Sequence, residues 1–219
     1  MLKPYKGYIF DMDGVLANTE PLHFIAENKT YDQLSIKVPA KEQESFVGTS
    51  QKQLWQTIKD NYNIKLDLDK IISMHMQNLS KVLMESELSC ISGVDDLILT
   101  LQKDNVNIAV ASSSTRQIVN MTLKKINLLE KFSTIVSSDD VKISKPNPEI
   151  FLITCEKMKL KTSEVIVIED SKNGVAASKA AGIDCIGFIN KNSGNQDLSK
   201  ANFLIDNFKQ LIDMYKNEK

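Results

Sequence analysis

Several features that would define a class of protein are missing from this sequence. No stretch reaches the roughly 18 apolar residues that a membrane span requires, so we expect no contact with a membrane. The net charge is −1, which lacks the basic excess typical of a nucleic-acid-binding protein. The N-terminal segment MLKPYKGYIF has no long apolar run, and we therefore expect no secretion signal.

Cysteine is scarce. The chain has only Cys90, Cys155 and Cys185, and these never form a CxxC pair. An odd number of widely spaced cysteines suggests neither a zinc site nor a disulfide framework. Each cysteine is expected to pack as a small apolar residue, which fits a reducing compartment and predicts a cytoplasmic protein.

The residues that are present have the composition of an ordinary globular protein, with 42% hydrophobic and 25% charged residues among 219. Short apolar runs alternate with helical patterns along most of the chain, which is typical of strands in a parallel sheet covered on both faces. The fold expected is a doubly wound, Rossmann-like α/β core. The predicted strands are 7–10, 107–111, 134–137, 165–168, 184–188 and 203–206.

One long segment does not follow this alternation. Between Asn18 and Glu85 there is almost no strand signal, and apolar residues recur at helical spacing. Pro39 and Gly48 are plausible breaks between helices. We expect a small bundle of about four helices inserted after the first strand, which divides the chain into a core of residues 1–17 and 86–219 and an inserted domain of residues 18–85.

Polar side chains follow four of the predicted strands. In a parallel sheet these strand ends lie along one edge, so the side chains should converge there. Taken singly, each is more simply read as a helix cap or a solvated charge; it is their joint occurrence that points to a site. The residues are Asp11, Asp13, Ser112, Lys145, Glu169 and Asp170.

This combination suits phosphoryl transfer. A carboxylate can attack phosphorus and hold it as an acyl phosphate, but a cation must first offset the repulsion between carboxylates and phosphate. The acidic residues offer only oxygen donors, which favours Mg²⁺ as the cofactor. Lys145 would add positive charge, and Ser112 a hydrogen bond to a phosphoryl oxygen.

Four motifs also carry a resemblance to a known family. They are FDMDGVL (10–16), VASSS (110–114), SKPNPEIF (144–151) and VIEDSKNG (167–174). The sequence resembles the haloacid dehalogenase-like hydrolase superfamily, in the helical-cap branch that includes β-phosphoglucomutase and sugar-phosphate phosphatases. The resemblance implies that the inserted helices form a cap that selects the substrate.

The resemblance also implies a role for each motif residue. Asp11 would be the nucleophile, and Asp13 the general acid and base that also gives its backbone carbonyl to the metal. Ser112 and Lys145 would hold the transferring phosphoryl group. Asp170 would ligate Mg²⁺, together with Asp11, and Glu169 would lie in the same site directly or through water.

Substrate contacts are expected from the cap. Glu20 and His23 match the family's TEPLH pattern, and the stretch 46–52 matches its cap motif around Gly48 and Ser50. In β-phosphoglucomutase an arginine that binds the second phosphate follows the motif serine, whereas this chain has Gln51, a poor anchor for phosphate. We also expect Ser113 to contact the substrate.

The leading hypothesis is therefore a Mg²⁺-dependent phosphatase for a small phosphorylated metabolite such as a sugar phosphate, acting as a monomer. A phosphohexomutase of the β-phosphoglucomutase type is the alternative. A phospho-accepting signalling domain and a non-catalytic relative are less favoured, because the former has no helical insert and the catalytic set is intact. Away from the motifs, we assign His75 to the surface, Trp55 to the cap core and residues 191–200 to a surface loop.

Overall fold

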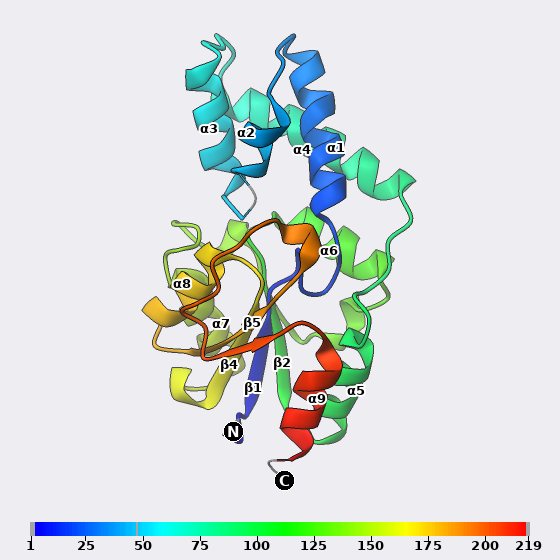
Figure 1. The fold of residues 1–219 in the computed structure, drawn as a ribbon, viewed down its shortest axis with the longest axis vertical. Helices are drawn as coiled ribbons and strands as arrows, with labels where there is room; N and C mark the ends of the chain where they lie inside the picture. Colours follow the sequence, from blue (N-terminus) through cyan, green and yellow to red (C-terminus); the bar gives the residue numbers. More distant parts are fainter. Residues whose placement is uncertain (1–2, 47, 218–219) are drawn as a thin grey trace.

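The computed structural model describes residues 3–46 and 48–217; Val47, in the predicted cap motif, lies outside them. A six-stranded parallel sheet has the order β3-β2-β1-β4-β5-β6, with β1 at its centre (Figure 1). This arrangement confirms the predicted doubly wound α/β core. The strands are β1 (Gly7–Phe10), β2 (Asn107–Ala111), β3 (Thr134–Val136), β4 (Val165–Glu169), β5 (Asp184–Phe188) and β6 (Phe203–Ile205).

Helices cover both faces of the sheet. Alternate residues of β1 point to opposite faces: Tyr8 and Phe10 belong to one hydrophobic cluster and Ile9 to another. The first cluster is shared with α5, α6 and α9, and the second with α7 and α8. These helices are α5 (Val94–Lys103), α6 (Arg116–Lys125), α7 (Glu149–Met158), α8 (Lys172–Ala180) and α9 (Phe208–Lys216).

The inserted segment forms four helices beyond the carboxyl ends of the strands (Figure 1). Trp55 is fully buried there and packs against Tyr31, with 5.4 Å between ring centroids, as expected of a cap-core residue. Within the described residues, none of the helices is long and apolar enough to cross a membrane. The four are α1 (Glu20–Gln33), α2 (Ala40–Glu44), α3 (Gln51–Asn61) and α4 (Leu68–Glu85).

The surface assignment of His75 is wrong. Its side chain is fully buried, 5.1 Å from the ring centroid of Trp55. His75 lies four residues after Ile71 and four before Leu79, on the face of α4 that packs inward. The sequence did not show this, because a single histidine at helical spacing is compatible with either a buried or an exposed position.

The two linkers of the insert run side by side. Ala17 forms an antiparallel bridge with Cys90, and the amide of Ile91 donates to the carbonyl of Leu16 at 2.9 Å. The apolar cluster on this face of the sheet extends into the lower turns of α1 and α4, through Leu22, Ala26, Leu79, Val82 and Leu83. The domain boundaries after residue 17 and after residue 85 stay a prediction.

The buried apolar side chains of the inserted helices, here called the cap cluster, give a test of the fold. They are Tyr31, Val38, Leu54, Trp55, Ile58 and Ile71. Ile58→Ala should lower the free energy of unfolding by about 2–4 kcal/mol, because Ile58 is fully buried in the cap cluster with Trp55. Met84→Ala, at a side chain that is 67% exposed, should change it by less than about 0.5 kcal/mol. Urea denaturation followed by fluorescence of Trp55 measures both. Equal stability of the two variants would contradict the packing described.

Candidate active site

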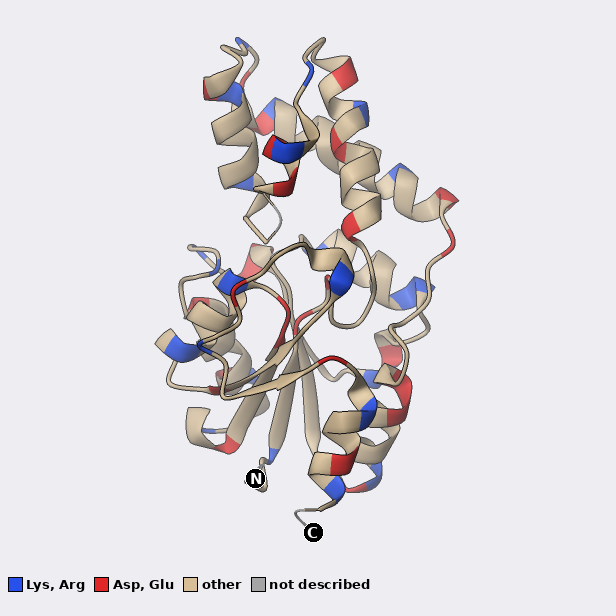
Figure 2. Ribbon diagram, in the orientation of Figure 1, with Lys and Arg blue, Asp and Glu red and all other residues tan. Residues whose placement is uncertain are grey.

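The carboxylates predicted to converge do so. Asp11 follows β1, Glu169 ends β4 and Asp170 follows it, on two neighbouring strands of the sheet. One carboxylate oxygen from each of the three lies within 4.8 Å of the others, and all three side chains are buried. Figure 2 shows acidic segments at this end of the central strands, beneath the cap helices.

Lys145 sits among these acids. Its Nζ lies 2.5 Å from Oδ1 of Asp11, 2.6 Å from Oε1 of Glu169 and 3.0 Å from the carbonyl oxygen of Ala111. Burial by itself would lower the pKa of Lys145, but the charges of Asp11 and Glu169 outweigh it and raise the pKa above its usual value. The lysine therefore carries its charge permanently and fixes the Asp11 carboxylate in place.

A single lysine does not neutralise three carboxylates. Burial raises the pKa values of Asp11 and Asp170 well above normal, and the charge of Glu169 raises both further. The oxygen-only donor set and its excess negative charge fit a hard divalent cation, so the predicted class of cofactor suits the residues present. Glu169 already receives hydrogen bonds at both oxygens, from Lys145 and from Ser171.

Two glycines permit this crowding. Gly14 has φ of +80°, and a Cβ there would lie 1.8 Å from Oδ2 of Asp170. In α8, a Cβ on Gly174 would lie 1.8 Å from the Cδ of Glu169. Any side chain at either position would displace a carboxylate of the cluster, which explains the glycine in the motifs FDMDGVL and VIEDSKNG.

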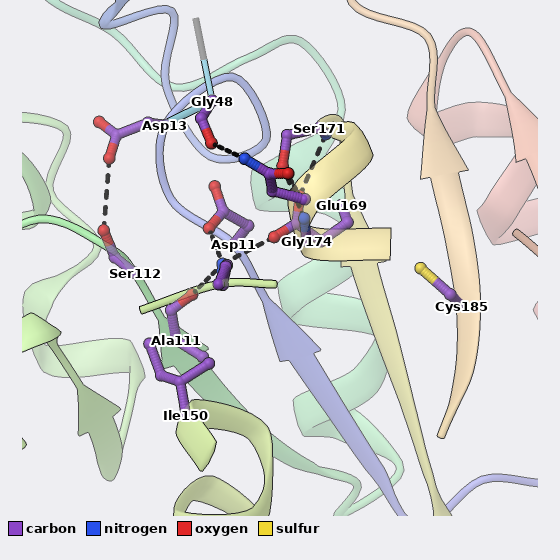
Figure 3. A network of polar contacts seen from close by, with 12 residues as sticks. Asp11, Asp13, Gly48, Ala111, Ser112, Ile150, Glu169, Ser171, Gly174 and Cys185 are labelled. Carbon is purple, nitrogen blue, oxygen red and sulfur yellow. Dashed lines mark hydrogen bonds and ion pairs between the residues drawn. The ribbon is translucent and has the colours of Figure 1, made fainter. Parts of the chain in front are cut away.

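Asp13 points away from this cluster (Figure 3). Its carboxylate accepts hydrogen bonds from Thr19 at 2.5 Å, Ser114 at 3.0 Å and Ser112 at 3.3 Å, and Nε2 of His23 lies 3.5 Å away. Burial opposes ionisation, but the hydrogen bond and charge of His23 and the hydrogen bonds from Thr19 and Ser114 lower the pKa of Asp13 overall. The carboxyl group is therefore ionised at rest.

A cavity of about 700 Å³ lies over these residues, between the core and the cap. The side chains of Asp11, Asp13, Lys145 and Asp170 form its floor. Five of the six predicted substrate contacts line it: Glu20, His23, Gly48, Gln51 and Ser113.

Three predicted residues do not line the cavity. Ser112 is fully buried, and its hydroxyl accepts from the amide of Ser114 and donates to Asp13. Glu169 is buried beneath Asp11 and Lys145. Ser50 caps the N-terminus of α3 by accepting from the amide of Gln53 at 3.3 Å.

The cap and the core touch at Gly48. Its carbonyl accepts a 2.8 Å hydrogen bond from Nδ2 of Asn173, in the first turn of α8 (Figure 3). Gln51, nearby, accepts a hydrogen bond from Nε1 of Trp55 at 3.1 Å, so its amide oxygen is already engaged. Lys52 is exposed and is not among the cavity residues.

Residues 191–200 form a largely exposed loop, as predicted, but the sequence did not show that its first half borders the cavity. Residues 191–196 line the cavity opposite the cap helices. Ser193 is buried and donates to Oδ2 of Asp170, while Asn190 donates to the carbonyl of Gly14 and to Asn18, at 2.8 Å each. The small polar residues of this loop match no motif in the sequence. They reach the site because the loop follows β5 at the edge of the sheet where the carboxylates lie.

Sequence reasoning also missed Ser114. This hydroxyl lies beside Asp13 and lines the cavity. Ser114 stands beside Ser112 and Ser113 in the sequence, but the turn after β2, and not the motif, determines that Ser113 and Ser114 line the cavity while Ser112 does not.

Comparison with known proteins supports the same reading. A model of the family described as haloacid dehalogenase-like hydrolase matches residues 8–188. The phosphorylated carbohydrates phosphatase of Thermotoga maritima is 30% identical over 181 residues, or 83% of each chain. The β-phosphoglucomutase of Bacillus subtilis is 27% identical, over 83% of this chain and 82% of its own.

A solved structure shares the whole arrangement. The crystal structure of CbbY from Rhodobacter sphaeroides in complex with phosphate superposes with a TM-score of 0.85 at 25% identity, over 94% of this chain and 96% of that one. The family match covers β1 to β5 and all four motifs. This chain therefore belongs to the haloacid dehalogenase-like hydrolase family of enzymes, as its motifs predicted.

Proposed function

We propose that the chain is a Mg²⁺-dependent phosphatase that hydrolyses a small phosphorylated sugar through an aspartyl phosphate on Asp11. The observation that carries this proposal is the position of Asp11, whose carboxylate lies on the cavity floor against Lys145 and two further acids. The Thermotoga maritima relative, a phosphatase of phosphorylated carbohydrates, supports the substrate class.

In the first step, an Asp11 oxygen attacks phosphorus and the bond from phosphorus to the sugar oxygen breaks. Asp13 protonates that leaving oxygen. The carboxyl is ionised at rest, but an incoming phosphate dianion adds negative charge beside it, which raises its pKa and favours the protonated form. In the second step a water molecule attacks the aspartyl phosphate, Asp13 takes its proton, and phosphate leaves with Asp11 restored.

Other residues prepare these steps. Lys145 fixes the attacking carboxylate and stabilises negative charge on the phosphoryl oxygens. Ser112 positions Asp13, and Ser114 lies where it can donate to a phosphoryl oxygen. Asp11, Asp170 and the backbone carbonyl of Asp13 would hold Mg²⁺, with Glu169 behind them. The bound ion would supply positive charge for the phosphate.

The mutase alternative needs an anchor for a second phosphate. Gln51 is neutral and its amide oxygen is bonded to Trp55, while Lys52 lies outside the cavity. These contacts favour transfer of the phosphoryl group to water. Incubating the protein with glucose 1-phosphate and glucose 1,6-bisphosphate separates the two functions: free phosphate supports the phosphatase, and glucose 6-phosphate without free phosphate supports the mutase.

Asp11→Asn should lower phosphate release from the best sugar phosphate by at least about a thousand-fold, because the amide cannot act as the nucleophile. The measurement is phosphate release with Mg²⁺ over a panel of sugar phosphates. Asp69→Asn, at an exposed residue of α4, is the matched control and should keep full activity. An Asp11→Asn protein as active as this control would rule out the proposed nucleophile.

Mg²⁺ should raise the melting temperature, because it offsets the repulsion among the buried carboxylates of Asp11, Glu169 and Asp170. At 100 times the dissociation constant the stabilisation should be about 2.7 kcal/mol. Differential scanning fluorimetry measures the shift. Asp170→Asn should abolish it, and an undiminished shift in that variant would place the ion elsewhere.

The two histidines should titrate at opposite ends of the pH scale. Burial lowers the pKa of His75 to about 3, whereas in His23 the hydrogen bond and charge of Asp13 overcome burial and raise the pKa to about 9. The stabilisation from the His23 pair is present below about pH 6.5, the unfolded value, and is lost as the pH rises through 9.

NMR of the imidazole Cε1 protons measures both values. Neither signal should shift between pH 5 and pH 7.5 in the wild type. Asp13→Asn should bring the pKa of His23 down into that range and leave the His75 signal unchanged. A wild-type His23 that titrates near 6.5 would contradict the proposed ion pair.

A further inference from the structure

Glu27 is a buried acid that the proposed chemistry does not use. It lies on α1 four residues after His23, on the same face of the helix and roughly 6 Å further along its axis. Only 8% of its surface is exposed, and it borders the cavity. Among the described residues it has no hydrogen bond or ion pair, although most buried carboxylates have at least one such partner.

Its neighbours around the cavity do not supply a donor. Gln43 uses its amide hydrogens on the carbonyl of Val38 and on Asn28, at 2.8 and 3.3 Å. Leu54 and Phe46, which border the same space, are apolar. Burial raises the pKa of the Glu27 carboxyl to about 7, against the opposing charge of His23. The Glu27 carboxylate therefore borders the cavity without a hydrogen-bond donor from the described residues.

A ligand can satisfy such a group. A buried carboxylate without a donor is unfavourable, and a hydroxyl group of a bound molecule would relieve that cost. The same carboxylate repels an anion, and Glu20, two turns earlier on the same face of α1, adds to the negative charge at this side of the cavity. The cations that border the cavity on the outside, Lys41 and Lys191, are both exposed to solvent.

We propose that Glu27 determines specificity by accepting hydrogen bonds from the hydroxyl groups of a neutral sugar and by excluding a second phosphate. This inference rests on the proposed function. With the reacting phosphate beside Asp11, a sugar that extends past His23 brings its far hydroxyl groups to the next turn of α1. The substrate class is then a hexose or pentose monophosphate, and a sugar bisphosphate is a poor substrate.

The test compares Glu27→Gln with the wild type and with Glu85→Gln, which makes the same change at an exposed residue at the end of α4. For each protein kcat/KM is measured at pH 8, above the pKa of about 7 of Glu27, on three probes: the hexose monophosphate that the wild type hydrolyses fastest, the 1,6-bisphosphate of that hexose, and acetyl phosphate. Acetyl phosphate has no hydroxyl groups, so it serves as the reference for the chemical step.

Relative to acetyl phosphate, Glu27→Gln should lower kcat/KM for the monophosphate by about 10- to 100-fold, mainly through KM. It should raise kcat/KM for the bisphosphate, because the repelling charge is gone. Glu85→Gln should match the wild type on every probe. A structural defect cannot produce these opposite signs, and the melting temperature of Glu27→Gln at pH 8 should equal or exceed the wild-type value.

Several results would overturn the inference. They are unchanged ratios in Glu27→Gln, a parallel loss on both sugar probes, and a wild type that hydrolyses acetyl phosphate but no sugar monophosphate. The last of these would leave the phosphatase itself standing. A wild type inactive on acetyl phosphate and on every sugar would instead refute the proposed function, and the role of Glu27 with it.

Discussion

The contact between Lys145 and the carboxylates of Asp11 and Glu169 is the constraint on which the rest of the site depends. Carboxylates this close together repel one another, and their burial adds the cost of removing charge from water. Without a cation between them they would not keep these positions. One buried lysine with an elevated pKa holds two of them, and the remaining charge demands a further cation. The parallel sheet makes this crowding possible, because β1 and β4 are neighbours in register and deliver their terminal acids to one point.

The cap completes the arrangement from the other side. Asp13 turns toward the cap and is held by Thr19, at the start of α1, and by His23, in its first turn. The position of α1 is thus linked to the acid that would move the proton. The contact from Asn173 to Gly48 joins the second side of the cap to α8. Under the proposed function, proton transfer by Asp13 and substrate selection by Glu27 would both depend on α1.

Local patterns were sufficient to predict the strands and most of the side chains that converge at the candidate site. The short run of β-branched residues Val165–Ile168 is typical of a buried strand, and the place of its polar end follows from the parallel topology. Long-range packing was not predictable. The burial of His75 depends on α1 and α3 meeting α4 around Trp55, and the role of residues 191–196 depends on the path of the chain after β5. No motif marks Glu27 in the sequence, and its burial depends on the packing of its turn of α1 against the cavity.

The central claim is that Asp11 itself carries the phosphoryl group between substrate and water. Borohydride reduction of the enzyme during turnover of a sugar phosphate with Mg²⁺ tests it most directly, since the reagent converts an aspartyl phosphate to homoserine. Mass spectrometry of the digested protein should find homoserine at position 11 only when substrate and Mg²⁺ are both present. Turnover that leaves Asp11 unmodified, or homoserine at another aspartate, would contradict the account.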